Sequence, residues 1–326
     1  MGVVYQVCPF QALGPLTPIG EGLSPHVPGG AGWYSFLMKL ATALLLLSVS
    51  ASAAEPAFEV QLAEIEHIGA PPIDELLATL RSSRDRKEQM EVLDAIVNRA
   101  GGLQSDEQLR VVGALKDAYF SGFTPPEVRG KALIALGRCS AWFRDSFVQR
   151  DAILALSDAA LVDANDQLSS YRVYALRGLS EAAARLPNDL QVEEKVVITA
   201  MESMRRAQDR QEKFLSLMLF HTFLRARGGD TIARSFGLMA RVNEQLVDPL
   251  GRDVDSLYRD NDKDADYRYI LINSLRRLGW SISADAQLRH RIKTIFRNME
   301  GRETDARLRA ILREVNRQYA GLAAAD

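Results

Sequence analysis

Apolar residues recur at helical spacing along most of the chain. After the basic residue Arg129, small or apolar side chains stand three, four and seven positions later, as Ala132, Leu133 and Leu136. This spacing places the three side chains on one face of a helix, where they can join a shared core. The same frame follows Arg86, Arg172, Lys213 and Arg268, and it is partly kept after Arg307.

A second helical segment precedes each of these frames. The segments are Ile73–Arg81, Asp106–Phe120, Phe147–Leu161, Val192–Ala207, Ile232–Leu246 and Ala284–Met299. Glycine and proline mark the breaks, as at Gly101-Gly102 and Pro125-Pro126. Ser105 is expected to be the N-cap of its segment, with Gln108 completing a capping box. No stretch alternates with period two at the length of a strand, so the pattern predicts an all-α fold.

The predicted helix pairs repeat at a nearly constant interval. Successive frames are 43, 43, 41, 55 and 39 residues apart. This interval, together with the segment Pro126–Gly137, resembles that of HEAT repeats, which are close relatives of armadillo repeats. The resemblance implies a right-handed α-solenoid of about six helix pairs over residues 72–322, with Ala132, Ala175 and Ala310 allowing close helix approach. An unrelated all-α bundle is the alternative.

The resemblance also implies where a partner would bind. In such a solenoid the second helix of each pair lines an extended concave surface, so exposed positions on those helices are candidates for binding another protein. The positions that the helical periodicity places outside the core face are Lys131, Arg138, Tyr174, Arg177, Asn273, Arg277 and Arg313. Tyrosine and arginine are enriched at binding hot spots, although exposed helix positions are more often simply solvated.

The first part of the chain has a different composition. Residues 1–37 contain no Lys or Arg but many prolines and glycines, which leaves few regular structures open to them. Residues 38–54 combine one positive charge, a short apolar run and Ala51-Ser52-Ala53, the layout of a secretory signal peptide. We expect residues 1–37 to be a disordered, misassigned extension ahead of a translation start at Met38. Residues 55–71 are expected to be a lead-in segment.

The signal peptide predicts the location of the mature protein. We expect a periplasmic or secreted protein of the bacterial envelope that is not an integral membrane protein after cleavage. The apolar run is shorter than the roughly 20 residues of a membrane span, although an uncleaved anchor is the alternative. Removing the leader would leave Cys139 as the single cysteine, and its apolar helical context predicts a buried structural thiol.

The small net charge hides an uneven distribution. The chain has 326 residues and a net charge of −2, which does not favour a nucleic-acid binder. An acidic insertion at residues 247–266 accounts for the long interval, and residues 268–317 carry a net charge of +7. Arg289, Lys293 and Arg297 form a stripe on one helix that is predicted to bind anions. The alternative is a solvated face, partly neutralised by the insertion.

The insertion also contains alternating carboxylates. Asp260, Asp262, Asp264 and Asp266 have the spacing of calcium ligands in an EF-hand loop. However, Ala265 stands where the sharp turn requires glycine, and Leu271 stands where a bidentate glutamate is required. A solvated acidic loop whose last Asp caps a helix beginning at Tyr267 is therefore favoured over a weak calcium site.

Catalytic motifs are absent from the sequence. His67, His221 and His290 lie far apart, and no nucleophile elbow, phosphate-binding loop or zinc spacing is present. We therefore expect no cofactor and a non-enzymatic scaffold or adaptor for another protein. One alternative is a protein that binds envelope polyanions through its basic C-terminal helices, and another is an enzyme on a HEAT-like scaffold.

Overall fold

The computed structural model of the chain describes residues 71–258, 265–281 and 285–322. Regular structure within these ranges is helical throughout, which confirms the predicted all-α class. The expected extension, the signal peptide and, apart from Pro71, the lead-in segment lie outside the described residues. From Pro71 onward the chain forms one compact unit.

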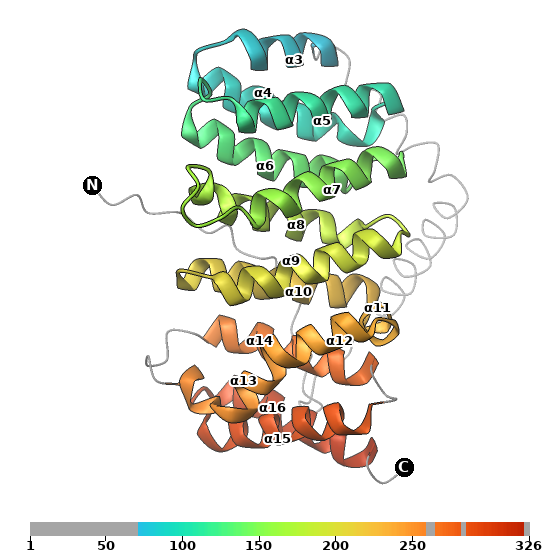
Figure 1. Cartoon of the computed structure of the whole chain (residues 1–326), viewed down its shortest axis with the longest axis vertical. Coiled ribbons are helices and arrows are strands. Elements are labelled where there is room, and N and C mark those ends of the chain that lie inside the picture. Colours follow the sequence, from blue (N-terminus) through green and yellow to red (C-terminus); the bar gives the residue numbers. More distant parts are fainter. Residues whose placement is uncertain (1–70, 259–264, 282–284, 323–326) are drawn as a thin grey trace, which may run out of the picture. The chain divides into compact units, whose positions relative to one another are not determined.

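The helices follow one another in antiparallel succession (Figure 1). They are α3 (Ile73–Ser82), α4 (Arg86–Arg99), α5 (Ser105–Phe120), α6 (Pro126–Ser140), α7 (Ser146–Ala160), α8 (Arg172–Ala182), α9 (Leu190–Arg206), α10 (Arg210–Arg227), α11 (Asp230–Arg234), α12 (Phe236–Val242), α13 (Asp248–Arg252), α14 (Ala265–Ser281), α15 (Ala286–Arg302) and α16 (Ala306–Leu322). Shorter turns are the 3-10 segments Ala100–Gly102, Ser169–Tyr171, Ala183–Arg185 and Val254–Leu257, and the π-helical turn Asn243–Val247.

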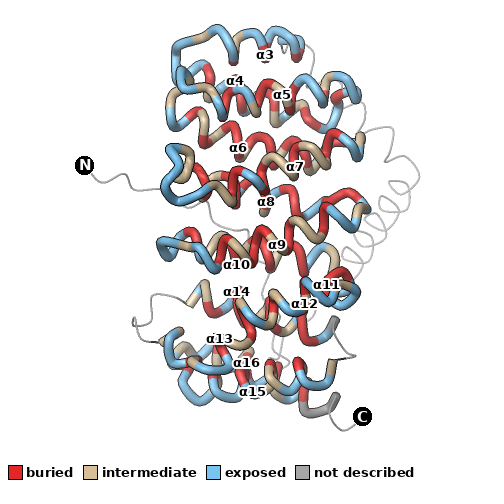
Figure 2. The backbone as a smooth tube through the Cα atoms, viewed as in Figure 1, coloured by how far each residue is buried: buried red, intermediate tan, exposed pale blue. Residues whose placement is uncertain are grey.

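These helices form two stacked layers. In the layer that we call the second layer, α4, α6, α8, α10, α14 and α16 pack against one another in that order. The first layer consists of α3, α5, α7 and α9, continued by α12, α13 and α15. Buried positions follow the sides of the helices that face the neighbouring elements (Figure 2). The core is therefore a continuous band of buried side chains between the two layers of helices.

The predicted core frame holds along most of the second layer. The positions three, four and seven residues after Arg129, Arg172, Lys213 and Arg268 are all buried. After Arg86 the middle position, Met90, is only partly buried. Helices α6, α8, α10 and α14 each pack between two neighbours of their own layer, which covers both small and large side chains of the frame, whereas α4 has only α6 beside it in that layer.

The partial frame after Arg307 fails at Ala310. Ile311 is packed against the core and Glu314 is exposed, as the broken frame predicts, but Ala310 is exposed and does not mediate a close helix approach. The buried side chains of α16 are instead Leu308, Leu312, Val315 and Tyr319. The reason is that α16 packs against α14 and α15 on one side alone, so a single narrow apolar stripe suffices.

Several predicted boundaries also differ from the structure. Gln104, not Ser105, is the N-cap of α5, and its peptide N–H donates to Glu107 at 2.8 Å. The single helix predicted over Ile232–Leu246 is divided into α11, α12 and the π-helical turn. Helix α14 begins at Ala265, so Asp266 lies in its first turn and is not its N-cap.

Two glycines allow the backbones of α6 and α8 to touch. A Cβ atom added to Gly137 would lie 2.0 Å from the carbonyl oxygen of Gly178, and one added to Gly178 would lie 2.5 Å from that of Leu133. Both are far inside van der Waals contact with backbone atoms, which cannot rotate away as a flexible side chain can. The spacing of these two second-layer helices therefore requires glycine at both positions.

We predict that Gly137→Ala lowers the free energy of unfolding by about 3 kcal/mol or more, since the helices must separate to accommodate the methyl group. Urea denaturation of the purified protein measures this change. Gly113→Ala is the matched control, because a Cβ there meets nothing within 4 Å. It should raise stability by about 0.5–1 kcal/mol through helix propensity. Equal losses in both variants would refute the close-contact explanation.

A buried ion pair joins the last two second-layer helices through the turn between α15 and α16. Nε of Arg268 lies 3.0 Å from Oε2 of Glu303, and its Nη2 lies 3.1 Å from Oε1. The two side chains are 1% and 0% exposed. The guanidinium also lies over the ring of Tyr258, 5.2 Å from its centroid. This bidentate geometry lets each charge compensate the other where water cannot.

We predict that Glu303→Gln lowers the free energy of unfolding by about 3–5 kcal/mol, because the Arg268 cation remains buried without a counter-charge. Thermal and urea denaturation measure the loss. Glu91→Gln removes a carboxylate from the exposed pair with Lys87, in which the side chains are 84% and 68% exposed, and should change stability little. A loss for Glu303→Gln no larger than that of this control would contradict the assignment.

Candidate functional site

Most of the predicted partner-binding residues make contacts between neighbouring helices. Lys131 on α6 forms an ion pair with Asp94 on α4 at 2.6 Å, and Arg138 on α6 pairs with Glu181 on α8 at 3.6 Å. The ring of Tyr174 covers Gly130, where an added Cβ would lie 2.9 Å from the ring. These side chains bridge the second layer, which limits how far they can reach for a partner.

Two other predicted residues are also occupied within the chain. The Asn273 amide donates to the carbonyl oxygen of Tyr269 at 2.8 Å, and Arg313 pairs with Glu300 at 3.4 Å. By contrast, Arg177 and Arg277 are exposed, and in the described parts of the chain neither has an ion-pair partner. The structure therefore separates bridging residues from two arginines that remain available.

A third available arginine lies beside a half-buried histidine. His221 on α10 has its Nδ1 3.2 Å from the Ser274 hydroxyl on α14. Arg225 follows His221 by one helical turn, is exposed, and likewise has no ion-pair partner among the described side chains. Arg225 is not among the residues predicted from the sequence, although its spacing of four from His221 places both on one helix face.

Two arginines act on the protonation of His221. Burial, the largest cause, together with the positive charges of Arg277 and Arg225 lowers the pKa of His221 to about 4. His221 is therefore neutral at pH 7. Below its unfolded pKa of about 6.5 the unfolded chain gains a proton that the folded protein refuses until about pH 4. This histidine consequently makes the fold less stable as the pH falls through that window.

Half-buried apolar side chains accompany the three arginines. Tyr174 on α8 and Phe214, Leu215 and Met218 on α10 are packed against the core but remain partly accessible. We call Arg177, Arg225 and Arg277 with these four residues the second-layer surface. It offers both apolar area and uncompensated positive charge, a combination found at protein interfaces.

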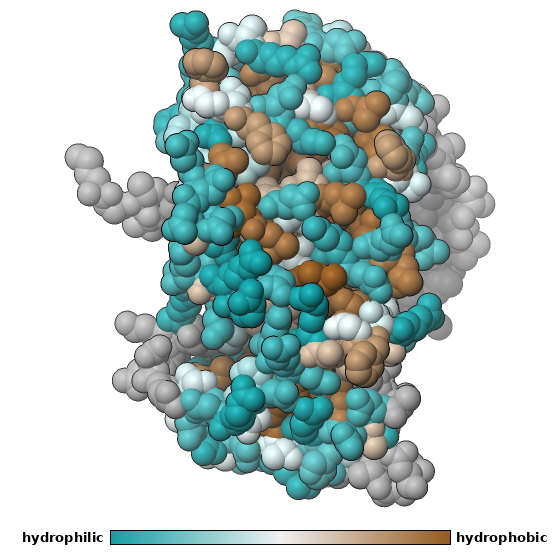
Figure 3. All heavy atoms as spheres, viewed as in Figure 1, coloured by the Kyte–Doolittle hydropathy of each residue, from teal (hydrophilic) through white to brown (hydrophobic). Residues whose placement is uncertain are grey.

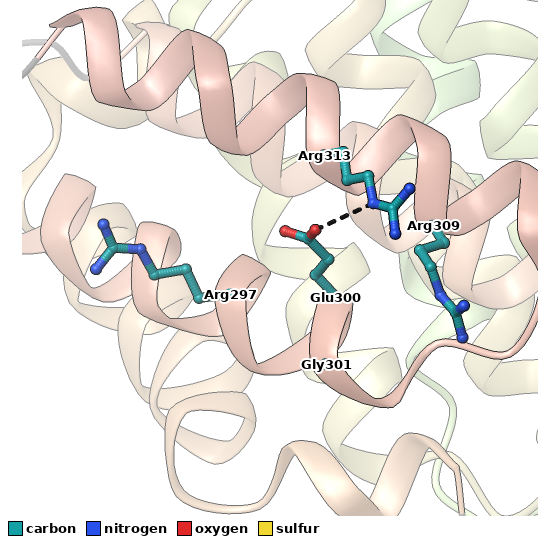
Figure 4. Close-up of a pocket in the computed structure, with 5 residues that line it drawn as sticks. All are labelled: Arg297, Glu300, Gly301, Arg309 and Arg313. Carbon is teal, nitrogen blue, oxygen red and sulfur yellow. Dashed lines mark ion pairs between the residues drawn. The ribbon is translucent and has the colours of Figure 1, made fainter.

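A separate basic hollow lies between the last two helices (Figure 4). It has a volume of about 520 Å³ and is lined by Arg297, Glu300, Gly301, Arg309 and Arg313. Arg297 extends away from Glu300, whereas Arg313 points toward it (Figure 4). Arg309 donates through Nε to the carbonyl oxygen of Glu303 at 2.7 Å. The three guanidinium groups therefore do not converge on one point.

The remaining residues of the predicted anion-binding stripe lie elsewhere on α15. Arg289 and Lys293 are half-buried and do not line the hollow, so only Arg297 of the stripe contributes to it. On another side of α15, Arg291 pairs with Asp248 and Arg302 pairs with Asp255. The acidic insertion thus neutralises part of the basic helix.

The insertion is not simply a loop. Its residues include α13 and the 3-10 turn Val254–Leu257. Of the calcium candidates, Asp260, Asp262 and Asp264 lie outside the described residues, and Asp266 is exposed. Within the described ranges no group of three or more His, Cys, Asp or Glu side chains could hold a metal ion.

Cys139 is fully buried, as expected, and burial raises the pKa of its thiol to about 12. It therefore stays protonated and is out of reach of a substrate. His290 is exposed on α15, and His67 lies outside the described residues. None of the helices in the described ranges is long and apolar enough to cross a membrane.

Exposed apolar side chains also gather along one edge of the first layer. They belong to the N-terminal ends of successive helices: Leu109 of α5, Phe147 of α7, Leu190 of α9 and Phe236 of α12, with Trp142 in the preceding turn of α7. Hydrophobic atoms recur along this side in the space-filling view (Figure 3). This apolar edge is not among the features predicted from the sequence, although Leu190 and Phe236 directly follow the N-cap residues Asp189 and Ser235.

Comparison with known proteins gives information about the fold alone. No family model matches the chain, and no curated protein matches it. An engineered protein solved by a structural genomics consortium matches with a TM-score of 0.50 and 14% identity, covering 78% of this chain and 98% of that chain. A second engineered protein matches with a TM-score of 0.38 and 15% identity, covering 76% and 67%. The first likeness supports the helical architecture, and the second is too weak for an argument.

We predict that Arg277→Gln raises the pKa of His221 above about 4, because one of the two nearby positive charges is lost while burial persists. Titration of the His221 ring proton by NMR measures this change. Arg144→Gln removes an exposed charge from the turn between α6 and α7 and should leave the pKa of His221 unchanged. An unaltered titration in Arg277→Gln would show that the arginine does not act on His221.

Proposed function

We propose that this protein is an exported, non-enzymatic scaffold built as a HEAT-like right-handed solenoid of about six helix pairs. The regular succession of first-layer and second-layer helices supports this proposal, as does the frame shared by four helices of the second layer. Its location in the bacterial envelope rests on the signal-like segment at residues 38–54.

We place the partner on the second layer. Contacts between α6 and α8 are more extensive than those between α5 and α7, and the glycine contact brings the second-layer backbones together. Closer spacing in one layer than in the other bends a helical stack, so the second layer would lie on its inner side. This is the surface that repeat proteins use to bind elongated partners.

The observation that carries the proposal is the set of three unpaired arginines on this layer. Lys131 and Arg138 there are occupied by Asp94 and Glu181, yet Arg177, Arg225 and Arg277 have no such acid in the described parts of the chain. Uncompensated positive charges on adjacent helices do not stabilise the fold. They can, however, stabilise a complex with a partner of complementary charge.

The alternative, binding of polyanions through the basic C-terminal helices, has less support. The charges of Arg291 and Arg302 are already compensated by the insertion, and the arginines of the hollow diverge. An extended anion could still follow the row of cations along α15, but the geometry offers no focused site.

We predict that the double variant Arg177→Glu, Arg277→Glu loses the partner that co-purifies with the parent protein after crosslinking in the native host, because the surface changes its sign. Quantitative mass spectrometry of the captured proteins measures the loss, which should be at least about tenfold. The control Arg144→Glu, Arg234→Glu makes the same charge change at exposed positions outside the second-layer surface. Retention of the same partners by the Arg177/Arg277 variant would refute this surface, provided that its circular dichroism matches the parent.

A further inference from the structure

The three arginines are not equally placed, and the pair beside His221 forms the more defined feature. Helices α10 and α14 pack against each other, and His221 on α10 contacts Ser274 on α14. Arg225 follows His221 by four positions and Arg277 follows Ser274 by three, so both exposed arginines lie one helical turn from this contact. The Ser274 hydroxyl holds that ring at 3.2 Å and itself donates to the carbonyl oxygen of Ile270 at 2.7 Å. The ring is therefore held by its neighbour on α14, while Arg225 and Arg277 are exposed to a ligand.

From this arrangement we infer that Arg225 and Arg277, beside His221, form a carboxylate-binding site, and that the partner presents an acidic polypeptide segment to it. The inference rests on the proposed function and narrows it to one class of ligand. Each guanidinium can donate two parallel hydrogen bonds to a carboxylate. The Ser274 hydroxyl gives its one proton to Ile270, so the neutral His221 ring donates from Nδ1 to Ser274, and the two guanidinium groups supply the donors to the carboxylate.

The neighbouring apolar side chains favour a polypeptide over a purely charged polymer. Met218 lies one turn before His221 on α10, and Phe214 lies one turn before Met218. Both are only partly buried. A ligand that follows α10 would therefore meet apolar surface first and then the positive site. A peptide with alternating apolar and acidic residues satisfies both, whereas a polysaccharide or an inorganic anion satisfies the charge alone.

The lack of competing acids strengthens the assignment. Glu181 on α8, Glu212 on α10 and Glu193, which pairs with α10, each have an arginine of their own. None pairs with Arg225 or Arg277. A carboxylate from a partner would thus bind these arginines without breaking an intramolecular salt bridge. The free energy of binding would therefore not be reduced by the loss of such a bridge.

Isothermal titration calorimetry of the full chain with defined peptides tests this inference. The probe is a short peptide in which glutamates alternate with leucines. Two reference peptides replace all glutamates by glutamine or all leucines by serine. The parent protein should bind the first peptide and should bind each reference peptide at least about tenfold more weakly. Equal binding of the glutamine peptide would overturn the assignment of a carboxylate ligand.

Protein variants locate the binding site. Arg225→Gln and Arg277→Gln should each weaken the peptide by about tenfold, the loss of one charge-assisted contact. Arg144→Gln, which loses the same charge at a distant exposed turn, should bind like the parent. If Arg144→Gln weakens binding as much as Arg277→Gln, the attraction is merely nonspecific and the site is refuted.

NMR of the histidine rings provides a readout that does not depend on the variants folding equally well. Peptide binding should shift the ring signals of His221 and leave those of His290 on α15 in place. A His221 signal that does not move would overturn the proposal. Displacement of the peptide by inorganic phosphate at a similar concentration would also overturn it, because that result would indicate a different class of ligand. Should the host partner still require Arg177 and Arg277 while the peptide does not bind, the scaffold function would stand and only the ligand assignment would fall.

Discussion

The arrangement of the second layer depends on a backbone contact between two glycines. Gly137 and Gly178 bring α6 and α8 together so closely that no side-chain atom fits between them. This contact fixes the position of Tyr174 above Gly130 and of the ion pair between Arg138 and Glu181, because both bridge the same two helices. A wider spacing would loosen those bridges and change the surface that the layer presents.

Charge has two separate uses in this structure. Some charged groups join elements: the buried pair of Arg268 with Glu303 ties α14 to the turn before α16, and Asp248 and Asp255 hold the insertion to α15. Others, including Arg225 and Arg277, contribute nothing of that kind within the described chain. The distinction matters because net charge alone would treat them all alike, although only the second group can attract a partner without breaking the fold.

The fold was largely predictable because its helices obey a local rule. Apolar spacing reports which face of a helix is buried, and it was correct wherever a second-layer helix packs between two neighbours, as for Ala132, Leu133 and Leu136. It failed at α16, which lacks a neighbour on one side. The candidate site was less predictable. The helical periodicity of the sequence showed that Lys131 and Arg138 lie outside the core. It did not show that acidic residues on neighbouring helices form ion pairs with them. Such pairing depends on distances between helices, which no local pattern encodes.

Site-specific photocrosslinking in the native host tests the central claim, that the second layer is the binding surface, most directly. A photoreactive residue in place of Met218 would report on the second-layer surface, and one in place of Phe147 would report on the apolar edge of the first layer. The account predicts crosslinks to a discrete partner protein from position 218 and few or none from position 147. Crosslinks that form from position 147 but not from position 218 would contradict it.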